Sequence, residues 1–185
     1  PLLSWVLDSI SALSKKIESI VVIGHSAHEV EDYLNKNYKY VKTTLQKEQL
    51  GTGHAAAQAL PLLSDFKGLV IITCGDTPLV TTKSLRSLIK YHIENYSDLT
   101  VMTTVFDNPC GYGRIIRNTK GEIIKIVEEK DASESIKEIE EVNTGIYCLE
   151  WSKIKKAFSE LRNNNSQGEY YLTDIIKWAR DNSLK

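Results

Sequence analysis

Strand-like and helix-like segments alternate along roughly the first hundred residues, and this alternation narrows the folds open to the chain more than any other feature. The predicted strands are 20–24, 41–46, 69–74 and 99–106, and the predicted helices are 2–13, 26–37, 55–63 and 82–95. Residues 20–24 and 69–74 are short apolar runs rich in β-branched residues, typical of strands buried on both faces of a parallel sheet. We therefore predict an α/β fold with a mixed, mainly parallel sheet flanked by helices.

The second half of the chain departs from this alternation. Residues 113–117 and 122–128 flank Asn118-Thr119-Lys120-Gly121, which predicts a β-hairpin with a short loop. A polar segment follows at 130–141, then a strand at 145–149 and helices near 151–162 and 171–181. Neither a repeat nor a linker is visible, so we expect residues 1–185 to form a single domain with a β-hairpin excursion.

The composition argues against several classes of function. The chain has 23 Lys and Arg against 24 Asp and Glu, so no basic excess suggests a nucleic-acid partner. No segment approaches the ~20 apolar residues of a membrane span, and no signal-peptide layout opens the chain. Cys74, Cys110 and Cys148 are too far apart for a metal-ligand motif and favour reduced thiols, as in a cytoplasmic protein. Because Pro1 leads straight into a helical pattern, we expect a piece of a longer protein.

The stretch Gly51–Ala56 matches the G-x-G-x-x-A fingerprint of dinucleotide-binding loops, and Asp76 lies at about the expected ~20-residue distance downstream. Against that interpretation, residues 47–50 separate the glycines from the preceding strand and place Glu48 near the supposed pyrophosphate. An ordinary helix-entry turn is one alternative. Another is a loop whose backbone N–H groups meet a base or phosphate. His54 within the stretch either touches a ligand or satisfies local backbone groups.

Polar residues follow the predicted strands elsewhere. Asp76 comes directly after an apolar strand, where it is either a Mg²⁺ ligand or the cap of a turn, because Mg²⁺ commonly takes one or two carboxylates plus substrate phosphates. Arg114 is either an anion clamp or part of a strained hairpin entry. The charged run 128–131 has the pattern of a solvated strand end, and 143–145 suits sugar hydroxyls or a turn.

Six blocks of the sequence together resemble a known family. The blocks are QKEQLGTGHAAAQALPLL, CGDTPLV, DNPCGYGRIIRN, IVEEKDA, EVNTGIY and NNNSQGEYYLTDII. In this order and spacing they are similar to the pyrophosphorylase domain of bacterial UDP-N-acetylglucosamine pyrophosphorylases, which usually carry a glucosamine-1-phosphate acetyltransferase domain as well. The resemblance covers almost the whole chain.

This resemblance implies a Rossmann-like nucleotide-diphospho-sugar transferase fold and a Mg²⁺-dependent uridylyltransferase. The implied substrates are UTP and N-acetylglucosamine 1-phosphate, and the implied products are pyrophosphate and UDP-N-acetylglucosamine, a precursor of peptidoglycan and the cell wall. The alternatives that stay open are a dinucleotide-dependent oxidoreductase and a non-catalytic sugar-nucleotide-binding domain.

The resemblance also implies roles for particular residues. Uridine would contact Gln46, Gly51 and Thr52. Asp76 would be the catalytic Mg²⁺ ligand, with Gly75 beside it and with Cys74 in place of the larger polar or aromatic residue usual in the family. The residues that would line the sugar are Gly113, Glu128, Asn143, Tyr171 and Thr173.

Parts of the family pattern have no counterpart in this sequence. They are the N-terminal glycine-rich loop for the triphosphate, a second metal ligand, and the acetyltransferase domain with its hexapeptide repeats. We therefore expect a fragment that is inactive alone, cut from a parent protein that would form homotrimers through the absent domain.

Overall fold

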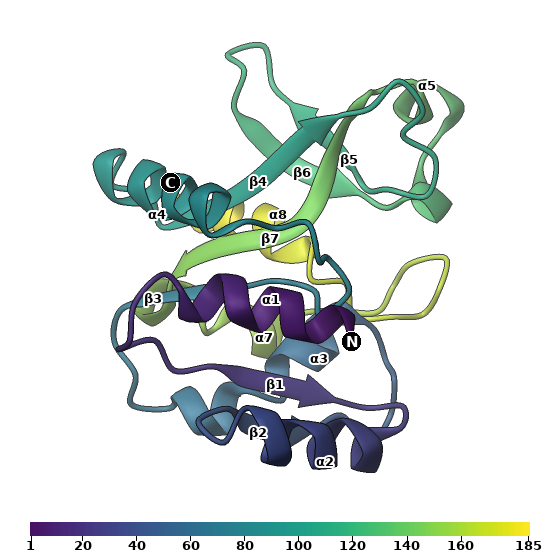
Figure 1. The fold of residues 1–185 in the computed structure, drawn as a ribbon. Coiled ribbons are helices and arrows are strands. Elements are labelled where there is room, and N and C mark those ends of the chain that lie inside the picture. The colour runs from purple at the N-terminus through teal and green to yellow at the C-terminus, as the bar shows by residue number, and fades with distance from the viewer.

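The computed structural model describes residues 1–185 and contains two sheets (Figure 1). The smaller sheet is the parallel pair of β1 (Ile20–Ile23) and β2 (Lys42–Leu45). The larger sheet consists of β3 (Leu69–Ile72), β4 (Leu99–Val105), β5 (Arg114–Arg117), β6 (Ile123–Val127) and β7 (Glu141–Glu150). Its order is β3-β7-β5-β6, and β4 also pairs with β7.

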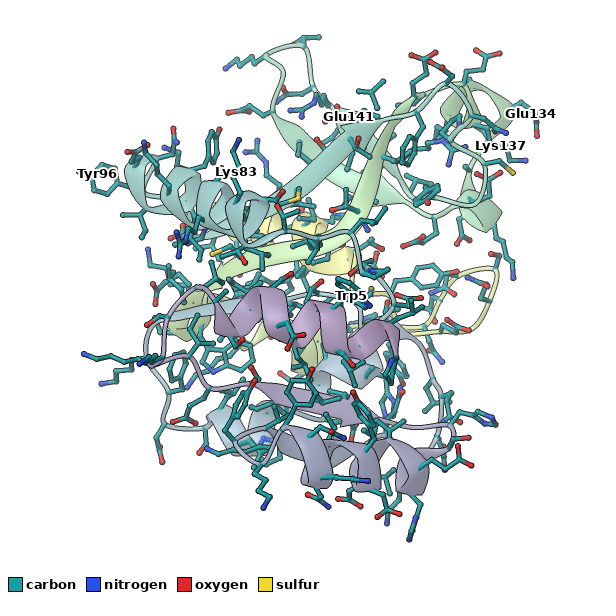
Figure 2. All side chains as sticks on the ribbon, viewed as in Figure 1. Trp5, Lys83, Tyr96, Glu134, Lys137 and Glu141 are labelled. Carbon is teal, nitrogen blue, oxygen red and sulfur yellow. The ribbon has the colours of Figure 1, made fainter.

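Strand β7 is the centre of the larger sheet. It pairs antiparallel with β4 from Glu141 to Leu149, with β3 from Tyr147 to Glu150 and with β5 at Val142. Strand β4 pairs with one edge of β7 along almost its whole length, so β3 and β5 pair with the other edge. Glu141, labelled in Figure 2, joins three of these strands, since it accepts hydrogen bonds from Arg117 Nε (2.8 Å) and Thr103 Oγ1 (2.7 Å).

Helices cover both faces of β7. On one face Ile146 and Cys148 pack with Leu85 and Leu88 of α4 (Thr82–Glu94), next to α1 (Leu2–Ser11). On the other face Tyr147 and its neighbours pack with a larger apolar cluster from three further helices. Those helices are α6 (Trp151–Ile154), α7 (Ala157–Glu160) and α8 (Asp174–Asp181). The remaining elements are α2 (Ala27–Asn37), α3 (Thr52–Ala57), α5 (Glu134–Lys137) and the 3₁₀ turns at Leu60–Leu63 and Glu129–Asp131.

The predicted α/β class and the predicted hairpin, now β5–β6, are confirmed. The direction of pairing differs from the mainly parallel sheet that we expected. Only β1 and β2 pair in parallel, because β7 lies between β3 and β4 and runs antiparallel to both. Strands β3 and β4 therefore point the same way without being neighbours. None of the helices has both the length and the apolar character that crossing a membrane requires.

Candidate functional site

The first group of predicted site residues lies in the loop after β2. Gln46 is 8% exposed, and its backbone N–H donates to Ile23 O (2.8 Å), which extends the pairing of β1 and β2. Its side-chain Nε2 donates to Gly51 O (3.2 Å) and lies 3.0 Å from His54 Nδ1. The Gln46 side chain is therefore held by the glycine segment itself.

Gly51 and Gly53 let this loop pack against a segment far along the chain. Gly51 has a φ of +107°, and a Cβ added there would lie 2.7 Å from Tyr170 O. A Cβ added to Gly53 would lie 2.5 Å from Leu161 Cδ1. The close approach that the two glycines permit is thus to the chain itself. In a dinucleotide-binding loop the glycines instead leave the strand directly and face a pyrophosphate.

Three hydrogen bonds fasten the loop to that segment, and one of them runs from Tyr170 N to Leu50 O (2.8 Å). Gly53 N donates to Tyr170 O (2.7 Å), and Leu172 N donates to Thr52 Oγ1 (3.0 Å). Helix α3 is only six residues long. Residues 170–172 therefore hold both Thr52 and Gly53 by hydrogen bonds.

The second group brings together four residues of the predicted sugar side. Thr173 Oγ1 donates to Glu128 Oε1 (2.9 Å), and Asn143 N donates to Gly113 O (2.9 Å). A Cβ added to Gly113 would lie 3.2 Å from Glu128 Oε2, so glycine there leaves room for the carboxylate. The four residues come from separate segments of the chain and converge at one end of the larger sheet.

Glu128 is the electrostatic centre of this second group. Burial raises the pKa of its carboxyl, the hydrogen bond from Thr173 lowers it, and the charges of Asp174 and Asp131 raise it further. The net effect is a raised pKa, so Glu128 holds a proton more readily than an exposed glutamate does. Burial and Asp131 also raise the pKa of Asp174.

Tyr171 is buried beside the second group. Its hydroxyl accepts a hydrogen bond from Gln167 Nε2 (2.8 Å). Burial raises the pKa of the Tyr171 hydroxyl, and nearby Asp131 adds to this effect. The side chain is therefore tied to the loop that contains Gln167.

Tyr147 is a residue of this region that sequence reasoning missed. It is 1% exposed, and its hydroxyl makes no hydrogen bond. Burial raises the pKa of this hydroxyl, the neighbouring Asn143 lowers it, and Glu128 and Cys74 raise it. The sequence did contain a signal for Tyr147. Side chains alternate between the two faces of a strand, so Asn143, Gly145 and Tyr147 of β7 lie on the same face.

Asp76 lies beyond the end of β3, outside both groups. Its carboxylate is exposed and takes part in no hydrogen bond or ion pair, while Gly75 faces Leu3 of α1. Cys74 lies near the second group through Gly145: its Sγ is 3.2 Å from a Cβ added to Gly145, and Gly145 N donates to Asn143 Oδ1 (3.0 Å). The pKa of the Cys74 thiol is raised by burial and by the charge of Asp76.

Arg114 does not act as an anion clamp. It is 1% exposed, and its guanidinium pairs with Glu129 Oε2 (2.8 Å) and donates to Tyr112 O and Lys137 O. The prediction that 128–131 is a solvated strand end is also wrong for the first two residues. Glu129 is needed to neutralise a buried cation, and Glu128 is part of the second group.

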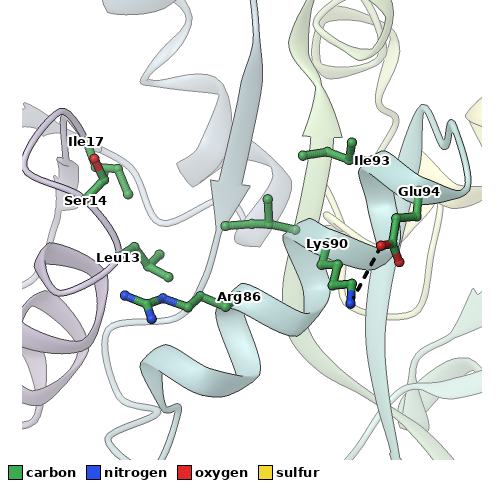
Figure 3. Close-up of a pocket in the computed structure, with 8 residues that line it drawn as sticks. Leu13, Ser14, Ile17, Arg86, Lys90, Ile93 and Glu94 are labelled. Atoms are coloured by element: carbon green, nitrogen blue, oxygen red, sulfur yellow. Dashed lines mark ion pairs between the residues drawn. The ribbon is translucent and has the colours of Figure 1, made fainter.

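Two cavities elsewhere on the surface contain none of the predicted site residues. A groove of about 450 Å³ lies between the segment after α1 and α4, and Figure 3 shows Leu13, Ile17, Arg86 and Ile93 along it. A larger hollow of about 960 Å³ lies along β4 and α4. The candidate site is thus separate from both.

A family model described as nucleotidyl transferase matches residues 3–184. The chain belongs to this nucleotidyl transferase family. It is 46% identical over 181 residues to the bifunctional protein GlmU of Caldanaerobacter subterraneus subsp. tengcongensis and 45% identical over 183 residues to that of Clostridioides difficile. These matches cover 98% and 97% of this chain but 38% and 39% of the relatives, so the chain spans less than two fifths of their length.

Solved structures support the fold of this nucleotidyl transferase. An apo UDP-glucose pyrophosphorylase superposes with a TM-score of 0.73 at 16% identity, covering 98% of this chain and 76% of the other. A UDP-glucose pyrophosphorylase complexed with UDP-glucose gives a TM-score of 0.71 at 19% identity, covering 100% and 76%. At these identities the match shows the nucleotide-diphospho-sugar transferase fold.

Proposed function

We propose that this nucleotidyl transferase is the pyrophosphorylase part of a UDP-N-acetylglucosamine pyrophosphorylase. It would form UDP-N-acetylglucosamine and pyrophosphate from UTP and N-acetylglucosamine 1-phosphate. One observation carries the proposal most directly: Leu172 bonds to Thr52 in the first group, and the next residue, Thr173, bonds to Glu128 in the second. A uridine group and a sugar group fastened to two consecutive residues make one continuous site for a ligand that contains both.

The roles of the side chains follow from this arrangement. Gln46, Gly51 and Thr52 would hold the uracil and its ribose, while Glu128 and Asn143 would bind the sugar by hydrogen bonds. In the reaction a phosphate oxygen of the sugar phosphate attacks the α-phosphorus of UTP. The new P–O bond forms as the bond from the α-phosphorus to the bridging oxygen of pyrophosphate breaks. Such phosphoryl transfer depends mainly on positioning and charge neutralisation, which two fixed groups can supply.

The residues present fit a Mg²⁺ ion that shares its coordination with substrate. No three His, Cys, Asp or Glu side chains form a complete metal site. Mg²⁺ is usually held by one or two carboxylates together with substrate phosphates, and the free carboxylate of Asp76 suits that role. When bound there, Mg²⁺ would neutralise charge on the phosphates.

The cellular setting in this proposal is the cytoplasm, in the synthesis of cell-wall precursors. All three cysteines are free, which fits a reducing compartment. The homotrimeric parent implied by the family resemblance stays a prediction.

Calorimetric titration tests the proposed function. UDP-N-acetylglucosamine should bind saturably and more tightly than UDP, whereas NADH should give no saturable heat. Thr173→Val should weaken binding of the UDP-sugar while leaving UDP unaffected, because it removes the bond to Glu128. Thr119→Val, in the exposed hairpin loop, is the matched control. Saturable NADH binding without a response to the UDP-sugar would instead support the oxidoreductase.

Catalysis is tested by pyrophosphate release from UTP and N-acetylglucosamine 1-phosphate in the parent protein, with and without Mg²⁺. The proposal expects release only when both substrates and the metal are present. A parent that binds the UDP-sugar but releases no pyrophosphate would be a non-catalytic binding protein.

A further inference from the structure

Two residues of the second group are each followed in the sequence by one member of a buried ion pair. Gly113 precedes Arg114, Glu128 precedes Glu129, and Arg114 Nη2 lies 2.8 Å from Glu129 Oε2. Because Arg114 pairs with Val127, the start of β5 lies beside the end of β6. The ion pair is therefore next to the residues that we expect to bind the sugar.

The guanidinium of Arg114 joins three segments of the chain. Its side chain is 2% exposed and donates hydrogen bonds to Tyr112 O, just before β5, and to Lys137 O of α5 (3.3 Å), a residue labelled in Figure 2. Its contact with Glu129 adds the turn after β6. The loop before β5 and the turn after β6 are thus fastened to the same buried group.

Charge rather than hydrogen bonding joins Arg114 to Glu129. Arg114 Nε and Glu129 Oε2 are both buried, and neither makes a hydrogen bond. Such an ion pair contributes little stability compared with a well-packed apolar pair, because taking two charges out of water is costly. The pair does, however, hold the ends of the two strands together.

The positions of Gly113 and Glu128 depend on this arrangement. A Cβ added to Gly113 would lie 3.2 Å from Glu128 Oε2, so the backbone and the carboxylate are already close. Gly113 O accepts from Asn143 N (2.9 Å), and Glu128 Oε1 accepts from Thr173 Oγ1 (2.9 Å). A shift of the turn after β6 relative to β5 would therefore displace the Glu128 carboxylate from these neighbours.

We propose that Glu129 is a positioning residue for the sugar side of the site. Its attraction to Arg114 fixes the turn Glu129–Asp131 and so holds the preceding carboxylate, that of Glu128, where it meets the sugar. The inference rests on the proposed function, in which Glu128 binds the sugar by hydrogen bonds.

The test compares the affinities for UDP-N-acetylglucosamine and UDP by calorimetry, and their ratio is called the sugar advantage. Glu129→Gln keeps the size of the side chain and removes the charge that attracts Arg114. The sugar advantage should fall about tenfold, the effect of misplacing one hydrogen bond to a charged group, while the affinity for UDP stays unchanged.

Asp98→Asn is the matched control. Asp98 is buried, pairs with Lys153 (2.5 Å) and accepts from Glu150 N (2.8 Å) at the last residue of β7, whereas Asn143 lies near the first. This variant should lose stability in urea and keep the sugar advantage. A merely structural role for Glu129 predicts instead that both variants lose stability and both keep the advantage.

Two further measurements do not depend on Glu129→Gln folding. Arg114→Lys keeps the charge but lacks the planar fork that reaches three segments, so it should also reduce the sugar advantage. In the wild type, the NMR resonance of Arg114 Nε–H should shift on addition of the UDP-sugar but not of UDP. A resonance that the UDP-sugar leaves unmoved would overturn the inference.

The outcomes separate the two claims. A wild type that binds the UDP-sugar no more tightly than UDP would overturn the proposed function and this inference with it. A wild type with a sugar advantage that persists in Glu129→Gln would overturn the role of Glu129 alone.

Discussion

Replacement of Gly51 by alanine tests whether the glycine loop is built to meet residues 169–171. The backbone at Gly51 has a φ of +107° and a ψ of 172°, a region essentially restricted to glycine, where an L side chain costs about 1–3 kcal/mol. The new Cβ would also lie 2.7 Å from Tyr170 O, 2.9 Å from Tyr170 N and 2.9 Å from Glu169 Cβ. Two of these atoms are backbone and cannot rotate away, so overpacking adds about 1–3 kcal/mol.

The expected loss of stability for Gly51→Ala is therefore about 2–6 kcal/mol. In a chain of this size, Tm falls by about 2–4 °C for each kcal/mol, so a loss near the middle of that range lowers Tm by about 8–16 °C. Urea unfolding and thermal melting both measure this change. UDP binding should weaken as well, because displacement of the loop moves Gln46.

Gly121→Ala is the matched control for this experiment. Gly121 has a φ of +79°, but a Cβ added there meets no atom within 4 Å, so only the backbone cost of about 1–2 kcal/mol applies. Equal destabilisation by the two substitutions would refute the idea that Gly51 is needed for packing against Tyr170.

Three further perturbations test other parts of the structure. Asp76→Asn should abolish Mg²⁺-dependent turnover of the parent protein and leave the melting temperature unchanged, since the carboxylate is exposed and unpaired; undiminished turnover would exclude a metal role. Glu129→Ala should cost about 3–5 kcal/mol in urea unfolding, because it leaves the buried Arg114 cation unpaired, and a loss below ~1 kcal/mol would contradict that account. Acidification should destabilise the protein through His92, because burial lowers the pKa of this side chain in the folded state. The stability that neutral His92 contributes is complete above pH ~6.5, the ordinary pKa of histidine. It is lost as the pH falls toward the lower pKa of the folded state. His92→Gln should flatten this part of the stability profile against pH, and an unchanged slope would show that His92 does not cause it.

Local patterns in the sequence predicted most of the elements. The apolar β-branched runs became β1 and β3, and Thr81 caps α4 by accepting from Ser84 N. The pairing of the sheet could not be predicted in the same way. Strand β7 is separated from β3 by about seventy residues of sequence, and no local signal shows that it inserts beside both β3 and β4.

The candidate site was likewise predictable from the sequence in part only. The resemblance to the pyrophosphorylase family assigned Glu128, Asn143 and Thr173 to the sugar side, and these residues lie close to one another in the structure. The burial of Arg114 could not be predicted, because a hairpin arginine has the same local pattern whether or not a glutamate meets it in the core. The free hydroxyl of Tyr147 was hidden for a related reason, since a tyrosine in an apolar strand normally fills the core.

Amide NMR during titration with UDP and then UDP-N-acetylglucosamine shows whether the two groups form one continuous ligand site. If one continuous site joins the two groups, UDP should shift the amides of Gly51 and Thr52. The UDP-sugar should shift these and, in addition, the amides of Gly113 and Asn143. Shifts confined to another surface, such as the groove around Arg86, would contradict the account, as would a UDP-sugar response identical to that of UDP.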